Sequence, residues 1–114
     1  MALNLNQVDE ILEQVKNFSV ERFGDKLVSV ILYGSYARGD FEEDSDIDIM
    51  ILVDMDASVL SRYQTEFSHF GTGVDLNYDV LTSFLLQDRN TFESWKNVLP
   101  FYRNVISEGV TAYG

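Results

Sequence analysis

Two short apolar runs constrain the fold of this chain more than any other feature of its sequence. Leu27–Tyr33 (LVSVILY) is rich in β-branched residues and stops at a glycine, and residues 46–54 read DIDIMILVD. Runs of this length and composition are typical of buried β-strands. The second run has two faces, formed by Ile47, Ile49, Ile51 and Val53 on one side and by Asp46, Asp48, Met50 and Leu52 on the other. We therefore predict a core strand that carries two carboxylates at its beginning.

The first segment of the chain has the pattern of an amphipathic helix. Apolar residues recur at helical spacing over residues 6–23. Asn6 is the predicted N-cap, and Gly24 is the predicted stop.

The segments after the two strands continue the alternation of helix and strand. Residues 57–70 predict a helix, and residues 73–87 predict a third strand. A helix between two strands implies a right-handed crossover, so these strands should be parallel and begin at the same edge of the sheet. Asp88 is expected to cap a further helix that ends before Pro100. The segment FYRNVISEGV then predicts a short closing helix and an extension.

The composition narrows the compartments and partners that we expect. Eight Lys and Arg against nineteen Asp and Glu give a net charge of −11, which disfavours a nucleic acid partner. The chain has no cysteine and no apolar run near the roughly 18 residues of a membrane span. Its N-terminus lacks the pattern of a signal peptide. We expect a single cytoplasmic domain over residues 1–114 without membrane contact, and the oligomeric state stays open.

The paired carboxylates point to a metal. Asp46 and Asp48 share one strand face with α-carbons roughly 6–7 Å apart, and two such charges at the end of a core strand repel each other and lose hydration. A divalent cation removes that cost. Mg²⁺ prefers oxygen ligands and completes its coordination with substrate phosphates, and metal ions of this kind promote in-line displacement at phosphorus.

The turn after the first strand offers groups that can bind phosphate. Gly34 permits a close approach of the backbone, and the N–H groups of a turn that opens a helix bind phosphate. Ser35 adds a hydroxyl donor, and the guanidinium of Arg38 can reach a terminal phosphate. We therefore predict that the turn holds a leaving pyrophosphate beside a metal on the carboxylate strand.

Three other interpretations of this region fit the sequence less well. Gly34 and Gly39 have the spacing of a P-loop, but Asp40 and Phe41 stand where Lys and Ser or Thr are required. An EF-hand loop from Asp44 would need glycine and glutamate where the chain has Ile49 and Met55. The acidic run over residues 40–48, taken alone, is typical of a solvated loop. Asp48 lies between two isoleucines of a strand pattern, and this placement favours a site.

Residues 34–54 (GSYARGDFEEDSDIDIMILVD) resemble the signature of the DNA polymerase β-like nucleotidyltransferase superfamily: Gly-Ser, then Arg-Gly, then Ser-Asp-x-Asp on a strand. The short chain is most similar to the minimal nucleotidyltransferase branch. This resemblance implies an α/β (α+β) nucleotidyltransferase fold, a small mixed β-sheet flanked by helices. It implies Asp46 and Asp48 as catalytic Mg²⁺ ligands, and Gly34 and Ser35 on the triphosphate of ATP or another NTP.

The resemblance also implies a third acidic residue on the following strand. Asp79 and Asp75 both qualify, because both have the same parity on the predicted third strand. We prefer Asp79 as the third catalytic and metal-binding carboxylate, with Asp75 as the alternative.

Members of the minimal branch often pair with a HEPN protein as antitoxin and toxin. The resemblance therefore implies that the chain moves a nucleotide, AMP from ATP, onto a tyrosine of a HEPN-type partner. A small-molecule transferase of the aminoglycoside-modifying kind is a second reading. A degenerate module that only binds a partner is a third.

Overall fold

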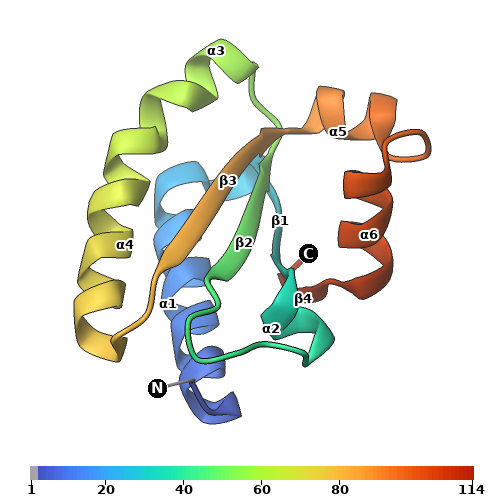
Figure 1. The fold of residues 1–114 in the computed structure, drawn as a ribbon. Coiled ribbons are helices and arrows are strands. Elements are labelled where there is room, and N and C mark those ends of the chain that lie inside the picture. The colour runs from blue at the N-terminus through green and yellow to red at the C-terminus, as the bar shows by residue number, and fades with distance from the viewer. Residues whose placement is uncertain (1–2) are drawn as a thin grey trace.

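A four-stranded mixed sheet forms the centre of the computed structural model, which describes residues 3–114 (Figure 1). The strand order is β3-β2-β1-β4. β1 (Leu27–Tyr33) runs antiparallel to β2 (Ile47–Val53) and to β4 (Val110–Tyr113). β2 runs parallel to β3 (Thr82–Asp88), and the pairing begins at Ile47 and Thr82. The first two strands and the parallel pair with a common edge confirm the expectations from the sequence.

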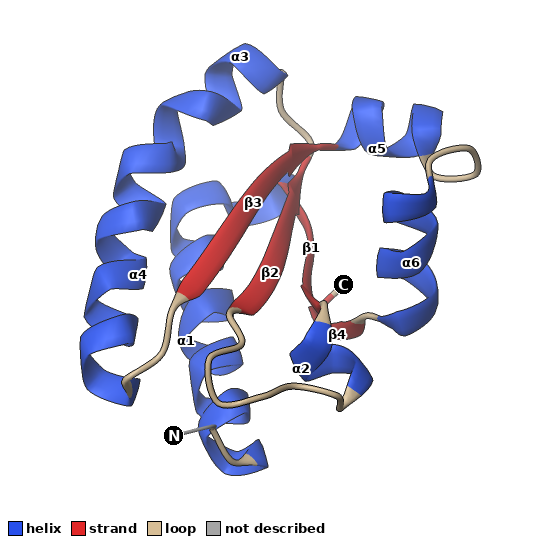
Figure 2. Ribbon diagram, viewed as in Figure 1, coloured by secondary structure: helices blue, strands red, loops and turns tan. Residues whose placement is uncertain are grey.

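Helices cover both faces of this sheet (Figure 2). One face, with the alternate side chains Ile47, Ile49, Ile51 and Val53, packs against α1 (Leu5–Phe23) and α4 (Gln64–Tyr78). Met50 and Leu52 on the other face pack against Phe92 of α5 (Arg89–Trp95) and Tyr102 of α6 (Pro100–Glu108). The remaining short helices are α2 (Ser35–Arg38), α3 (Ala57–Leu60) and the 3-10 turns Gly24–Lys26 and Ser61–Tyr63. None of the helices within residues 3–114 is long and apolar enough to span a membrane.

The start of the first helix differs from the prediction. Asn4 caps α1: its side chain accepts from the Gln7 N–H at 2.9 Å, and the Gln7 side chain accepts from the Asn4 N–H at 3.0 Å. This reciprocal capping box satisfies two N–H groups, whereas Asn6 as N-cap would satisfy one. The predicted cap at Asn6 is therefore wrong, and the predicted end at Gly24 is confirmed.

The boundary between the second long helix and the third strand was also predicted wrongly. Residues 73–78 belong to α4, and β3 begins only at Thr82. The helical spacing of the buried side chains Phe67 and Val74 continues beyond residue 70, so the segment that looked like the start of a strand packs as a helix against the core. Tertiary packing thus overrides the strand-like composition of this segment.

The C-terminal segment closes the sheet on the side of β1. Asp88 caps α5 as predicted, because its side chain accepts from the Thr91 N–H at 2.9 Å. α5 ends at Trp95, and Pro100 is the first residue of α6. The extension after α6 forms β4, which the sequence pattern did not predict as a strand.

Candidate active site

The glycine turn lies between the end of β1 and the start of α2. Gly34 adopts φ 75° and serves as the N-cap of α2. Its carbonyl accepts from the N–H groups of Ala37 and Arg38, both at 3.1 Å. The N–H groups at the start of a helix have no partner within that helix. The first N–H groups of α2 therefore remain available to a ligand beside the end of β1.

Asp48 lies directly against this turn. β1 and β2 pair so that Asp48 stands opposite Tyr33, the last residue before Gly34. A methyl group built on Gly34 would collide with a carboxylate oxygen of Asp48 and lie 3.4 Å from its Cγ. The predicted meeting of the carboxylate strand and the glycine turn is thus present in the fold.

The surroundings of Asp48 disfavour its negative charge. Burial raises the pKa of Asp48, the nearby Asp46 carboxylate raises it further, and the guanidinium of Arg38 partly opposes both effects. Burial also raises the pKa of Tyr33, to which the charge of Asp48 adds. Asp46 itself precedes β2 and is exposed. The two carboxylates therefore lie close enough to repel each other, as a cation-binding pair does.

Arg38 sits one helical turn from Gly34 and is held by two carboxylates. Its Nε lies 3.2 Å from Asp40, and its Nη1 lies 3.5 Å from Glu108 on α6. The hydrogen bond to Asp40 is the main reason that the pKa of Arg38 is raised. The guanidinium already binds anionic groups in this structure, so a phosphate would have to displace at least one of them.

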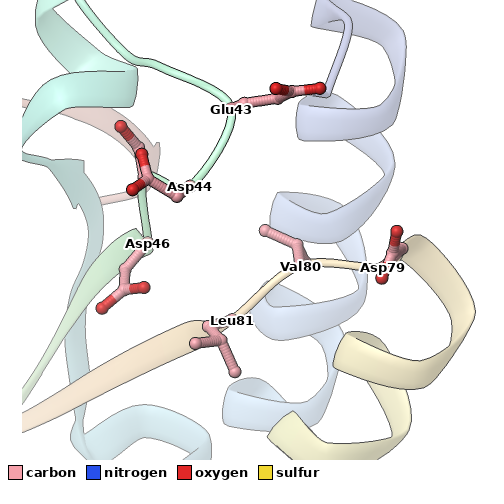
Figure 3. A pocket seen from close by; sticks show the side chains of 7 residues that line it. Glu43, Asp44, Asp46, Asp79, Val80 and Leu81 are labelled. Carbon is pink, nitrogen blue, oxygen red and sulfur yellow. The ribbon is translucent and has the colours of Figure 1, made fainter. Parts of the chain in front are cut away.

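A pocket of about 260 Å³ opens beside Asp46 (Figure 3). It lies between the loop that precedes β2 and the segment that leads into β3. Its lining residues are Glu43, Asp44, Ser45, Asp46, Asp79, Val80 and Leu81. This acidic pocket adjoins the proposed metal-binding strand from the side opposite α6.

The structure does not place Asp79 and Asp75 on a strand, and that part of the prediction is wrong. Asp79 is the C-cap of α4 with φ 53°, a left-handed conformation that interrupts any strand parity. Figure 3 shows its carboxylate and that of Asp46 on opposite sides of the pocket, not directed toward each other. Asp75 belongs to α4, and its Oδ1 accepts from the Thr82 N–H at 2.8 Å. On β3 the residue opposite Asp48 is Ser83.

The structure thus brings Asp48, Asp46 and Gly34 together, whereas Asp79 lies across the acidic pocket from Asp46. Within residues 3–114, no group of three or more His, Cys, Asp or Glu side chains is arranged to hold a metal ion. The role of Asp79 as a metal ligand stays a prediction.

Residues of α6 line the site on its other side, and the sequence pattern did not identify them. A second cavity, of about 210 Å³, lies between the turn and this helix. Tyr33, Gly34, Arg38, Phe101, Asn104, Val105 and Glu108 line it. The only signal in the sequence was the helical spacing of the four α6 residues, which is equally typical of a packing face.

Comparison with known proteins shows which family of proteins has this fold and this motif. The chain belongs to the nucleotidyltransferase domain family, whose model matches residues 12–106. It is therefore a nucleotidyltransferase, as the motif at residues 34–54 predicted, with a mixed sheet flanked by helices.

Its relatives carry a more specific name. A Methanocaldococcus jannaschii protein named as a candidate protein adenylyltransferase is 30% identical over 105 residues, which cover 92% of this chain and 97% of that protein. The protein adenylyltransferase MntA of Thermococcus cleftensis is 38% identical over 64 residues, covering 56% of this chain and 63% of that one. One chain of a toxin–antitoxin crystal structure with AMP-PNP shares the fold with a TM-score of 0.55 and 20% identity, covering 96% and 74% of the two chains.

Proposed function

We propose that this chain transfers AMP from ATP to a hydroxyl group of a partner protein. The contact between the Asp48 carboxylate and Gly34 is the observation that carries the proposal. A carboxylate that can bind a metal ion thus lies beside a turn that can bind phosphate, and a nucleoside triphosphate requires both groups for binding. The ATP substrate implies a reaction in the cytoplasm.

The residues present fit Mg²⁺. Asp48 on β2 and Asp46 just before this strand offer hard oxygen ligands, and the charge of Asp46 helps to raise the pKa of Asp48, which a bound cation would oppose. Bound there, Mg²⁺ would neutralise charge on the phosphates and lower the pKa of an attacking hydroxyl. We propose that Asp46 and Asp48 supply the protein ligands and that Asp79 remains outside this pair.

The chain itself positions the triphosphate. Backbone N–H groups of the turn at Gly34 and the Ser35 hydroxyl bind its oxygens, and Arg38 binds the terminal phosphate once Glu108 has released it. The acceptor oxygen transfers its proton to water and attacks the α-phosphorus, and the bond from that phosphorus to the bridging oxygen breaks as pyrophosphate leaves with the electron pair. Positioning and electrostatic stabilisation provide the catalysis.

The acceptor that we propose is a tyrosine of a HEPN-type toxin. The relatives in Methanocaldococcus and Thermococcus are named for transfer to protein. A toxin–antitoxin complex is among the proteins with this fold, and the minimal branch that the motif resembles often pairs with HEPN proteins. The chain would then act as an antitoxin.

The test is label transfer to a partner. Incubation of the chain with α-labelled ATP, Mg²⁺ and a candidate HEPN partner should place label on a partner tyrosine, identified by mass spectrometry. Chelation of the metal should abolish the transfer. Binding of ATP without transfer to protein would favour a small-molecule acceptor, and absence of both binding and transfer would favour a non-catalytic partner-binding module.

The role of Asp79 can be tested separately. Asp79→Asn should change kcat/KM for this transfer by less than about threefold, because Asp79 ends α4 and, within residues 3–114, forms no metal-holding group with Asp46 and Asp48. Folding should tolerate the change, since asparagine also adopts the left-handed conformation. A loss of two orders of magnitude would instead show that Asp79 moves into the site as a third metal ligand.

A further inference from the structure

We propose that the cavity between the glycine turn and α6 binds the nucleoside part of the nucleotide, with the base stacked on Phe101. This inference rests on the proposed function, which places the triphosphate on the turn. It adds a site for the base and the sugar and assigns α6 as the second wall of the nucleotide site.

The cavity joins groups from two distant parts of the chain. Tyr33, Gly34 and Arg38 form one wall, and four residues of α6 form the other. Phe101, Asn104, Val105 and Glu108 lie at the i, i+3, i+4 and i+7 positions, so they share one face of the helix. A ligand that enters this space therefore contacts the turn and α6 together.

The contacts at the two ends give the cavity a direction. At one end Arg38 lies 3.5 Å from Glu108, and at the other the rings of Tyr33 and Phe101 are 5.5 Å apart. Gly34 lines the same cavity and lies between Tyr33 and Arg38 in the sequence. Phe101 and Glu108 are separated by seven residues of helix, or about 10 Å along the axis. The cavity thus runs from a cationic group to an aromatic one.

This direction matches the order of groups in a nucleotide. A terminal phosphate on Arg38 leaves the next phosphates beside Gly34, where the Asp48 carboxylate lies. The sugar and the base then extend toward Tyr33 and Phe101. The opposite orientation would place the base beside Glu108 and move the triphosphate away from Arg38.

The side chain of Phe101 is exposed enough to contact a ligand in the cavity. Its side chain is 44% exposed, while its neighbour Tyr102 is 8% exposed and Val105 2%. Tyr102 and Val105 anchor α6 in the core, and Phe101 lies outside that buried cluster although its ring meets that of Tyr102 at 5.6 Å. Phe101 meets Tyr33 at an interplanar angle of 88°, so their contact is edge to face. An aromatic ring beside a phosphate-binding turn is suited to stack on a nucleobase.

Two polar side chains on the same face complete the wall. The side-chain amide of Asn104 has no hydrogen-bond partner within the part of the chain that the structure describes, and it can both donate to and accept from a sugar or a base. Glu108 holds the Arg38 guanidinium until a phosphate replaces it. Substitutions at Glu108 should therefore change the binding of phosphates, whereas substitutions at Phe101 should change the binding of the base.

Titration calorimetry with two ligands separates the two ends. Mg²⁺-ATP carries a nucleoside, whereas Mg²⁺-tripolyphosphate presents the phosphates alone. We expect Phe101→Ala to raise the Kd for Mg²⁺-ATP about tenfold and to leave the Kd for Mg²⁺-tripolyphosphate unchanged. Phe101→Trp should retain ATP binding. Glu108→Gln should lower both Kd values, because it frees Arg38.

Ile106→Ala is the matched control, because Ile106 lies on α6 outside the cavity and is 53% exposed. It should change neither affinity, and circular dichroism will confirm that each variant is folded. Equal effects of Phe101→Ala on both ligands, or no effect on either, would overturn the nucleoside site while the phosphate turn stands. A wild-type chain that bound neither ligand would overturn the proposed function, and the nucleoside site with it.

Discussion

Asp48→Asn should reduce nucleotidyl transfer on the order of a thousandfold, because it removes one of the two carboxylates that we propose as ligands of the metal. Asp48 lies against Gly34 and beside Asp46, so its loss affects both the metal and the triphosphate. Asp56→Asn is the matched control: it removes the same charge from an exposed position whose side chain does not cap α3. Transfer rates with labelled ATP measure the difference. A tenfold loss or less in Asp48→Asn would show that this carboxylate does not bind the catalytic metal.

The same substitution should stabilise the metal-free fold at neutral pH. The pKa of Asp48 is raised in the folded chain, mainly by burial and then by Asp46. Between the ordinary aspartate value and this raised value, the folded state binds more protons than the unfolded state. Stability therefore falls as pH rises through this window, and the penalty is complete above it. Asparagine carries no charge, so the variant lacks the penalty.

Thermal unfolding between pH 3 and pH 8 will measure this effect. Without metal, the Tm of Asp48→Asn should exceed that of the wild type at pH 7 and approach it as the pH falls. Mg²⁺ should raise the Tm of the wild type and have little effect on the variant, because binding to the folded state alone is stabilising. A variant with a lower Tm at pH 7 would mean that the fold stabilises the Asp48 carboxylate.

Gly34→Ala should lose both stability and activity. Its φ of 75° disfavours any residue with a Cβ, and that Cβ would collide with the Asp48 carboxylate. Gly39→Ala is the matched control, since φ is 85° there and nothing lies within 4 Å of the added methyl group. Both variants should lose about 1 kcal/mol or more through backbone strain. Gly34→Ala should lose about 1–3 kcal/mol beyond this through the collision.

Chemical denaturation of the two glycine variants gives these free energies of unfolding. Only Gly34→Ala should also lose nucleotide transfer, because the displaced carboxylate can no longer meet the metal and the turn. A double-mutant cycle isolates the contact: in an Asp48→Ala background the extra cost of Gly34→Ala should largely disappear. Equal losses in Gly34→Ala and Gly39→Ala would show that the carboxylate moves aside without cost.

Much of the candidate site could be predicted from the sequence, because the residues that form it lie close together in the chain. Gly34, Asp46 and Asp48 lie within 15 positions of one another, on and beside two strands that pair directly. Strand alternation and one antiparallel pairing suffice to bring the carboxylate to the turn. Asp75 and Asp79 were placed wrongly because α4 extends to Tyr78 and ends at the left-handed Asp79, so that neither residue lies on β3.

The sequence by itself determined the central strands and the meeting of the Gly34 turn with Asp46 and Asp48, since each depends on residues close together in the chain. Only the tertiary structure decided that α4 extends to Tyr78 and that α6 faces the turn with Phe101 and Glu108. The physical reason is the range of the interactions. Residue spacing fixes which side chains share a face of one helix or strand, whereas packing against the common sheet fixes which faces meet.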